Sequence, residues 1–154
     1  MDRPKHFLYP GAIFASNEPY FITTILGSCV AVCLYDPVLK IGGMNHFMLP
    51  LWNGQGLASP RYGNIAIKKI IDKMEALGSS KANIKAKIFG GAEIIATNIN
   101  QFMIGDRNIH IAKDILKEEE IPVVGSSLAG KLGRKIIFDT YTGQIRQKYV
   151  GSRT

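Results

Sequence analysis

The first fifty residues contain several stretches that favour β-strands and none that favours an α-helix. Turn signals, among them Asp36-Pro37, separate four such stretches: 12–16, 20–26, 29–35 and 41–50. Residues 29–35 have small or apolar side chains on both faces, which is typical of a strand buried on both sides. A fold made of repeated β-α-β units needs helices throughout, so this half of the chain disfavours one.

Two helices are expected in the second half of the chain. The first has an apolar face at helical spacing, with Asn64 as its N-cap and Gly78 as its stop; the face consists of Ile67, Ile70, Ile71, Met74 and Leu77. The second helix is predicted over 107–119, and Asp106 or Asn108 is expected to cap it.

Further strands are expected around the second helix and near the C-terminus, at 84–89, 121–126, 134–139 and 144–150. The last two are predicted to form a hairpin. Consecutive strands with only two helices predict an α+β fold. In this fold, mixed or antiparallel sheets form a layered sandwich and the two helices pack outside it.

Composition narrows the class of protein further. A chain of 154 residues, of which 46% are hydrophobic and 20% charged, is expected to fold as a single domain over 1–154, with residues from about 151 to 154 frayed. No apolar run reaches the roughly 18 residues of a membrane span, and the N-terminus lacks the apolar stretch of a secretory signal. We therefore expect a cytoplasmic protein without membrane insertion. Its net charge of +7 favours acidic partners.

Cys29 is the strongest candidate nucleophile. It begins a strand directly after Gly27-Ser28, where a glycine permits a tight turn that leaves backbone N–H groups pointing outward. Such donors at Gly27 and Ser28 would stabilise an oxyanion that develops beside the thiol. The alternative is a buried cysteine that acts as a small hydrophobic residue, and that interpretation fits Cys33 better.

His46 lies in an otherwise apolar strand, MNHFML, so its ring needs a hydrogen-bond partner. It is either a core histidine satisfied by the backbone or a general base that faces Cys29. If strands 29–35 and 41–49 pair across the Asp36–Lys40 turn, the two side chains approach each other. A hydroxyl at Thr23 or Thr24 is able to contact the imidazole, although threonine is common in strands.

Metal and nucleic-acid binding are weaker interpretations. Cys29, Cys33, His46 and His110 would supply four zinc ligands, but their spacing matches none of the usual ligand pairs. We therefore expect no metal, and no other cofactor, since no nucleotide-binding motif occurs. We also expect no nucleic-acid partner, because aromatic residues are not interleaved with lysines 81, 85 and 87 in a stacking pattern.

The runs LGSCVAVCLYDP (26–37) and IGGMNHFMLP (41–50) resemble the CheD family, the chemoreceptor glutamine deamidases of bacterial and archaeal chemotaxis. The seventeen-residue spacing between the cysteine and the histidine is the most specific part of this resemblance. Further matches cover nearly the whole chain: PRYGN (60–64), KIFGGA (87–92), IGDRN (104–108) and GRKIIFDTYTG (133–143). The family is similar in fold to the catalytic domain of cytotoxic necrotizing factor toxins, which are also Cys–His glutamine deamidases.

The resemblance implies an activity and a set of site residues. The family's nucleophile falls on Cys29, its histidine on His46 and its threonine, six residues before the cysteine, on Thr23. It implies hydrolysis of receptor glutamine side chains to glutamate through a thioester, and the same site is able to hydrolyse a glutamyl methyl ester. It also implies two partners: the cytoplasmic helices of chemoreceptors as substrate, and the phosphatase CheC.

A non-catalytic alternative is a regulatory binding module that acts through CheC. Replacing Cys29 by alanine separates this alternative from the deamidase, because only catalysis needs the thiol.

Overall fold

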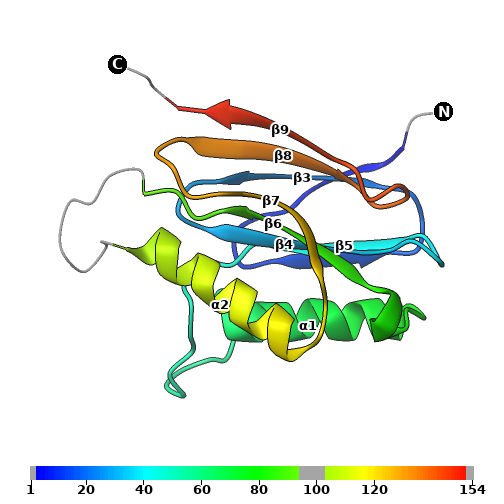
Figure 1. Ribbon diagram of the computed structural model, residues 1–154, viewed down its shortest axis with the longest axis horizontal. Coiled ribbons are helices and arrows are strands. Elements are labelled where there is room, and N and C mark those ends of the chain that lie inside the picture. Colours follow the sequence, from blue (N-terminus) through cyan, green and yellow to red (C-terminus); the bar gives the residue numbers. More distant parts are fainter. Residues whose placement is uncertain (1–2, 94–102, 152–154) are drawn as a thin grey trace.

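The computed structural model describes residues 3–93 and 103–151, which form two β-sheets and two α-helices. The four-stranded sheet has the order β1-β3-β8-β9 and the five-stranded sheet the order β2-β5-β4-β6-β7. Figure 1 shows that both helices lie on the same side of the strands. The elements are β1 (Lys5–Phe7), β2 (Ile13–Ser16), β3 (Phe21–Leu26), β4 (Val30–Asp36), β5 (Ile41–Asn45), α1 (Gly63–Ala76), a short 3₁₀ turn (Lys81–Asn83), β6 (Lys85–Gly90), α2 (Ile104–Glu118), β7 (Val123–Leu128), β8 (Gly133–Asp139) and β9 (Ile145–Val150).

Two hydrophobic cores hold these layers together, and β4 contributes to both. Its residues Val30, Val32 and Leu34 pack against the helices, whereas Ala31 and Cys33 pack between the two sheets. Side chains alternate across a strand, so a strand between two cores must be apolar at every position. The prediction of a strand buried on both faces is therefore confirmed, as is the α+β sandwich with two helices outside it.

The expected N-caps are wrong, whereas the expected stop is confirmed: Gly78 follows the C-cap Leu77 with a φ of 113°. Helix α1 begins at Gly63 after Tyr62 and has no side-chain cap; the side chain of Asn64 instead accepts a 2.9 Å hydrogen bond from the backbone N–H of Trp52. Helix α2 begins at Ile104, three residues before the predicted start, because Met103 reverses the chain with a φ of 69°. Asp106 and Asn108 thus lie inside α2 rather than at its cap.

The strand predictions hold to within two residues except at two places. Strand β1 was not expected, because its three residues KHF carry no alternating pattern; it pairs in parallel with β3. The strand predicted over 41–50 ends at Asn45, although Phe47 still pairs with Val30. Of the residues predicted to fray, about 151 to 154, all but Gly151 lie outside the described residues. The C-terminal hairpin, now β8 and β9, is confirmed.

Within the described residues, no helix combines the length and the apolar character that crossing a membrane requires.

Candidate active site

Cys29 lies at the corner between β3 and β4, and hydrogen bonds fix the backbone on both sides of it. The Gly27 carbonyl accepts a 3.0 Å bond from the Ala92 N–H, and the Cys29 carbonyl accepts a 2.9 Å bond from the Gly91 N–H. The thiol is half-buried and packs against the core between the sheets. The orientation of the peptide groups that flank the sulfur is therefore set by the segment that follows β6.

Two glycines make this close approach possible. A Cβ atom on Gly90 would lie 2.2 Å from the Cys29 carbonyl oxygen, and the φ of Gly90 is +110°, a conformation that side chains rarely adopt. A Cβ atom on Gly91 would lie 2.4 Å from the side chain of Ile109 on α2. The KIFGGA run is thus part of the wall behind Cys29, a role that the sequence alone did not assign.

The pairing of β4 with the segment around β5 brings Cys29 and His46 to one face of the sheet. Val30 pairs with Phe47 in the same antiparallel register that pairs Cys33 with Met44. Ala31 therefore stands opposite His46, and Cys29 is a diagonal neighbour of His46 on the face toward the four-stranded sheet. The predicted pairing across the Asp36–Lys40 turn is confirmed.

His46 is 2% exposed and is held by a side chain from the other sheet. Its Nδ1 atom lies 2.7 Å from Thr24 Oγ1, and the Thr24 hydroxyl donates a 2.7 Å hydrogen bond to the Leu8 carbonyl. Since that hydroxyl has a single hydrogen, Nδ1 must carry the proton and donate to Thr24. Nε2 is then unprotonated, and it is buried without a hydrogen-bond partner among the described residues.

The hydroxyl that contacts the imidazole belongs to Thr24, whereas the resemblance places the family's threonine on Thr23. Successive side chains of β3 point to opposite faces, so of the two threonines it is Thr24 that points toward the five-stranded sheet. Thr23 lines a hollow on the outer face of the four-stranded sheet. Of the two threonines that the sequence left open for the contact with the imidazole, the structure has Thr24, and not the position on which the resemblance places the family's threonine.

Both groups are uncharged at neutral pH. Burial lowers the pKa of His46 to about 4. Burial also raises the pKa of the Cys29 thiol above its ordinary value, and a backbone N–H at Cys29 itself acts in the opposite direction. The site therefore contains a neutral imidazole and a thiol rather than an ion pair. Cys33 is fully buried, and burial raises its pKa as well.

Asn108 of α2 joins the two segments that carry these groups. Its side-chain N–H₂ group donates to the Ser28 carbonyl at 3.0 Å and to the Met48 carbonyl at 3.1 Å. The side chain is fully buried. Ser28 precedes Cys29, and Met48 follows His46 by two residues. One amide group therefore fixes the spacing between the segment before β4 and the segment after β5. The sequence pattern pointed only to a helix cap at this residue.

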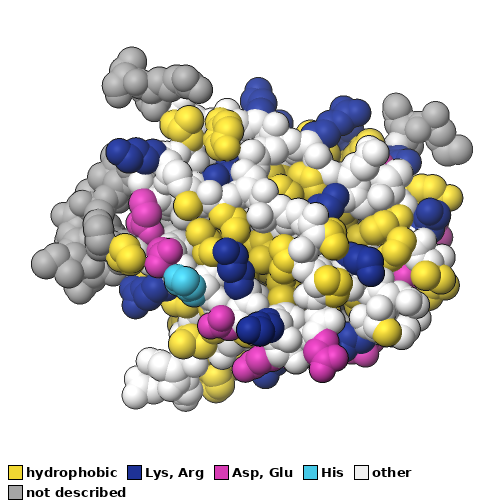
Figure 2. All heavy atoms as spheres, viewed as in Figure 1, with side chains coloured by type: hydrophobic (Ala, Val, Ile, Leu, Met, Phe, Trp, Pro, Cys, Tyr) yellow, Lys and Arg dark blue, Asp and Glu magenta, His cyan; other side chains and the backbone are white. Residues whose placement is uncertain are grey.

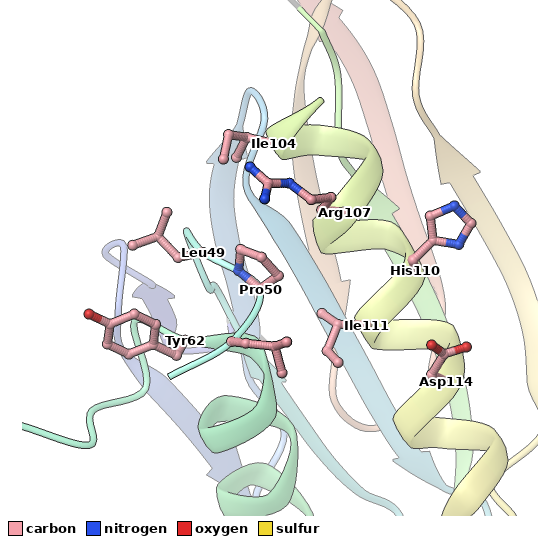
Figure 3. Close-up of a pocket in the computed structure, with 9 residues that line it drawn as sticks. Leu49, Pro50, Tyr62, Ile104, Arg107, His110, Ile111 and Asp114 are labelled. Carbon is pink, nitrogen blue, oxygen red and sulfur yellow. The ribbon is translucent and has the colours of Figure 1, made fainter. Parts of the chain in front are cut away.

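A groove with a volume of about 480 Å³ runs between α2 and the segment after His46. In Figure 3, Arg107 and Ile111 extend from α2 toward Leu49 and Pro50. The groove adjoins the Asn108 contacts, but Cys29 and His46 are not among its lining residues, which are Leu49, Pro50, Leu51, Tyr62, Ile104, Arg107, His110, Ile111 and Asp114.

The four residues considered as zinc ligands are not brought together. His110 is exposed on α2, where its Nε2 lies 3.4 Å from a carboxylate oxygen of Asp106. In the part of the chain that the structure describes, no three His, Cys, Asp or Glu side chains are grouped so that they could hold a metal ion.

A sequence model of the family described as "CheD chemotactic sensory transduction" matches residues 48–149, more than half of the chain. The chain belongs to the CheD family. Two relatives bear the name "Probable chemoreceptor glutamine deamidase CheD". The relative from Trichlorobacter lovleyi is 51% identical over 92% of this chain and 88% of its own length. The relative from Sulfurimonas denitrificans is 48% identical over 97% of each chain.

A solved structure resembles this CheD chain in fold alone. The hypothetical protein YfiH of Bacillus licheniformis superposes with a TM-score of 0.50 at 18% identity, over 75% of this chain and 49% of that one. The expected likeness to the cytotoxic necrotizing factor domain stays a prediction.

Proposed function

We propose that this chain hydrolyses glutamine side chains of chemoreceptors to glutamate, with Cys29 as the nucleophile and His46 as the general base. One observation carries the mechanism. Thr24 occupies Nδ1 of His46, so the free lone pair is on Nε2, on the same sheet face as the thiol. The names of the two relatives supply the substrate class.

The first half of the reaction forms a thioester. As the Cys29 sulfur attacks the amide carbon of the substrate, Nε2 of His46 accepts the thiol proton. The negative charge develops on the amide oxygen, where backbone N–H groups at Gly27–Cys29 would stabilise it; one such donor is typically worth about 2.7–4 kcal/mol. The imidazolium then gives its proton to the amide nitrogen, the C–N bond breaks and ammonia leaves.

The second half regenerates the enzyme. His46 accepts a proton from a water molecule as the water oxygen attacks the thioester carbon. The C–S bond breaks, the product leaves as glutamate, and the Cys29 sulfur recovers a proton from the imidazolium. A glutamyl methyl ester would pass through the same acyl-enzyme, with methanol as the first leaving group.

Thr24 has a positioning role in this scheme. It accepts from the Nδ1–H group while its own hydrogen is engaged by Leu8, so it favours the tautomer in which Nε2 is the base. The hydrogen-bonded chain from Nδ1 to Thr24 Oγ1 and on to the Leu8 carbonyl oxygen also stabilises the imidazolium that forms during attack.

The groove beside α2 is a suitable approach for a receptor segment. It is lined by apolar side chains such as Leu49 and Ile111, and Arg107 adds a positive charge at its wall. Asp114 also lines the groove and balances this charge, so its apolar strip is the feature that fits the apolar face of an amphipathic helix.

Mass spectrometry of a receptor fragment tests the proposal. Incubation with the unmodified protein should add about one dalton for each glutamine converted to glutamate, one passage through the acyl-enzyme. The Cys29→Ala variant should convert none, whereas the matched Cys33→Ala variant should remain active, since it retains the proposed nucleophile. Normal conversion by Cys29→Ala would contradict the mechanism. The Cys29→Ala variant should also still bind CheC if that phosphatase is a partner.

A further inference from the structure

The outer face of the four-stranded sheet is not covered by any described element. Its inner face, with Ile22, Ile136 and Phe138, packs on the five-stranded sheet, whose other face carries both helices. Figure 1 shows β9, β8 and β3 on the side of the molecule away from α1 and α2. Lys135 and Ile137 alternate with the inner residues of β8, so they point outward.

Positive charge is concentrated on this outer face. Among the described residues, it carries one carboxylate, Asp139, already paired with Arg3, and five cationic side chains: Arg3, Lys5, Lys135, Arg146 and Lys148. This gives a net charge of +4, more than half of the +7 of the whole chain. Helix α1 carries a net +1 and helix α2 none. Figure 2, in the same view as Figure 1, shows Lys and Arg side chains along the upper edge, where β8 and β9 lie, whereas the Asp and Glu side chains lie mostly lower, toward the helices.

A hollow of about 360 Å³ crosses the strands at the centre of this face. Lys5, Lys135 and Arg146 stand around it, and Thr23 and Ile137 contribute a hydroxyl and an apolar surface. Asp139 also lines the hollow, but it is paired with Arg3. The other three cations around this small, partly apolar depression suit a carboxylate side chain together with the aliphatic part of the residue that bears it.

We propose that this basic face, defined as Arg3, Lys5, Thr23, Lys135, Ile137, Arg146 and Lys148, binds an acidic segment of a partner protein. The charge of the face requires an acidic partner, and the hollow favours a peptide over nucleic acid. Among the described residues that line the hollow, Phe21 is the one aromatic residue, and the Arg3 guanidinium lies 5.2 Å from the centre of its ring, so a base has no open ring to stack on inside the hollow. The basic face lies on the opposite side of β3 from Thr24, and the inference therefore does not depend on the proposed deamidase activity.

Fluorescence anisotropy with a labelled ten-residue peptide of alternating Glu and Ala tests this inference. The unmodified protein should bind the peptide, and binding should weaken when salt is raised from about 50 to about 200 mM. The Lys135→Glu/Arg146→Glu double variant should lose about tenfold in affinity. The matched Lys68→Glu/Lys69→Glu variant changes the net charge equally but on exposed residues of α1, and it should bind as the unmodified protein does.

A charge-neutral variant and two alternative ligands complete the test. If the reversal variant fails to fold, Lys135→Gln/Arg146→Gln tests the same two residues. This variant removes the charges without reversing them, and it should lose affinity to a smaller extent. Equal affinity of the β8/β9 variants and the α1 variant would overturn the inference. Binding of a single-stranded oligonucleotide or of vesicles with anionic lipid, without binding of the peptide, would also overturn it, because the occupant would then not be a protein.

Discussion

The Nδ1 atom of His46 lies 2.7 Å from Thr24 Oγ1, across the interface between the two sheets. This contact ties the proposed base to β3 of the four-stranded sheet, while the candidate nucleophile is at the start of β4 in the five-stranded sheet. The geometry of the site thus depends on how the two sheets pack against each other, through a core that includes Leu26 and Met44.

Replacing Thr24 by valine should impair catalysis more than folding. The variant loses the acceptor that holds Nδ1–H, so the ring is free to adopt the other tautomer, and kcat should fall roughly ten- to hundredfold. The unpaired groups should also lower the free energy of unfolding by about 1–3 kcal/mol. Thr24→Ser, which retains the hydroxyl, should restore most of kcat. The matched Thr23→Val variant should stay near the unmodified rate; if Thr23→Val loses more activity than Thr24→Val, the assignment to Thr24 is wrong.

Replacing Asn108 by alanine should loosen the spacing between Cys29 and His46. Two half-buried carbonyls, those of Ser28 and Met48, would lose their donor, at a cost of about 1–3 kcal/mol. We expect kcat to fall while KM changes little, because the residue acts through the backbone of both groups. Asn64→Ala is the matched control, since it removes a single side-chain hydrogen bond at the start of α1. Equal kcat values for the two variants would show that Asn108 has only a structural role.

Gly90→Ala should be strongly destabilising. The added methyl group would lie 2.2 Å from the Cys29 carbonyl oxygen, in a backbone conformation with φ of +110°. We expect a loss of about 2–4 kcal/mol in urea unfolding, from strain and overpacking together. Gly125→Ala is the control, because its Cβ would meet the flexible side chain of Lys87 at 3.4 Å. A Gly90→Ala protein as stable as Gly125→Ala would contradict the account of the wall behind Cys29.

His46 should make stability fall on mild acidification. Its pKa is about 4 in the folded protein, against about 6.5 in the unfolded chain, so the unfolded chain binds more protons between these values. The free energy of unfolding should decrease by up to about 3 kcal/mol as pH falls from 7 to 4, and activity should be lost as the base is protonated. His46→Gln does not titrate in this range and should show a flatter profile in urea unfolding. Parallel profiles for both proteins would contradict the burial of a neutral imidazole.

The sequence predicted the elements of the fold better than it predicted their ends and their contacts. Alternation and helical spacing are local signals, so β4 and α1 were recognised from their own residues. The start of α2 depends on the left-handed conformation of Met103. Because Met103 is not a typical N-cap residue, the sequence gives no signal for this start. Strand β1 forms because β3 offers it an edge, and its three residues carry no period of their own.

The candidate site shows the same division. Cys29 and His46 were found from a glycine turn and from a polar residue in an apolar strand, and their shared face follows from the hairpin register. The choice between Thr24 and Thr23 depends on which face of β3 meets the other sheet, which is a property of sheet packing. The role of Asn108 depends on where α2 lies against two loops, and a single sequence carries no signal for that contact.

The most direct test of the central claim is covalent trapping. In a receptor peptide, a chloromethyl ketone that replaces the side-chain amide of the target glutamine offers a CH₂ carbon that the Cys29 sulfur attacks; chloride leaves, and the thioether that forms is not hydrolysed. Peptide mapping by mass spectrometry should find the adduct on Cys29 and not on Cys33, and the labelling rate should fall at least about a hundredfold in His46→Ala. Labelling at the same rate without the imidazole, or an adduct on Cys33, would contradict a mechanism in which Nε2 of His46 activates the Cys29 thiol.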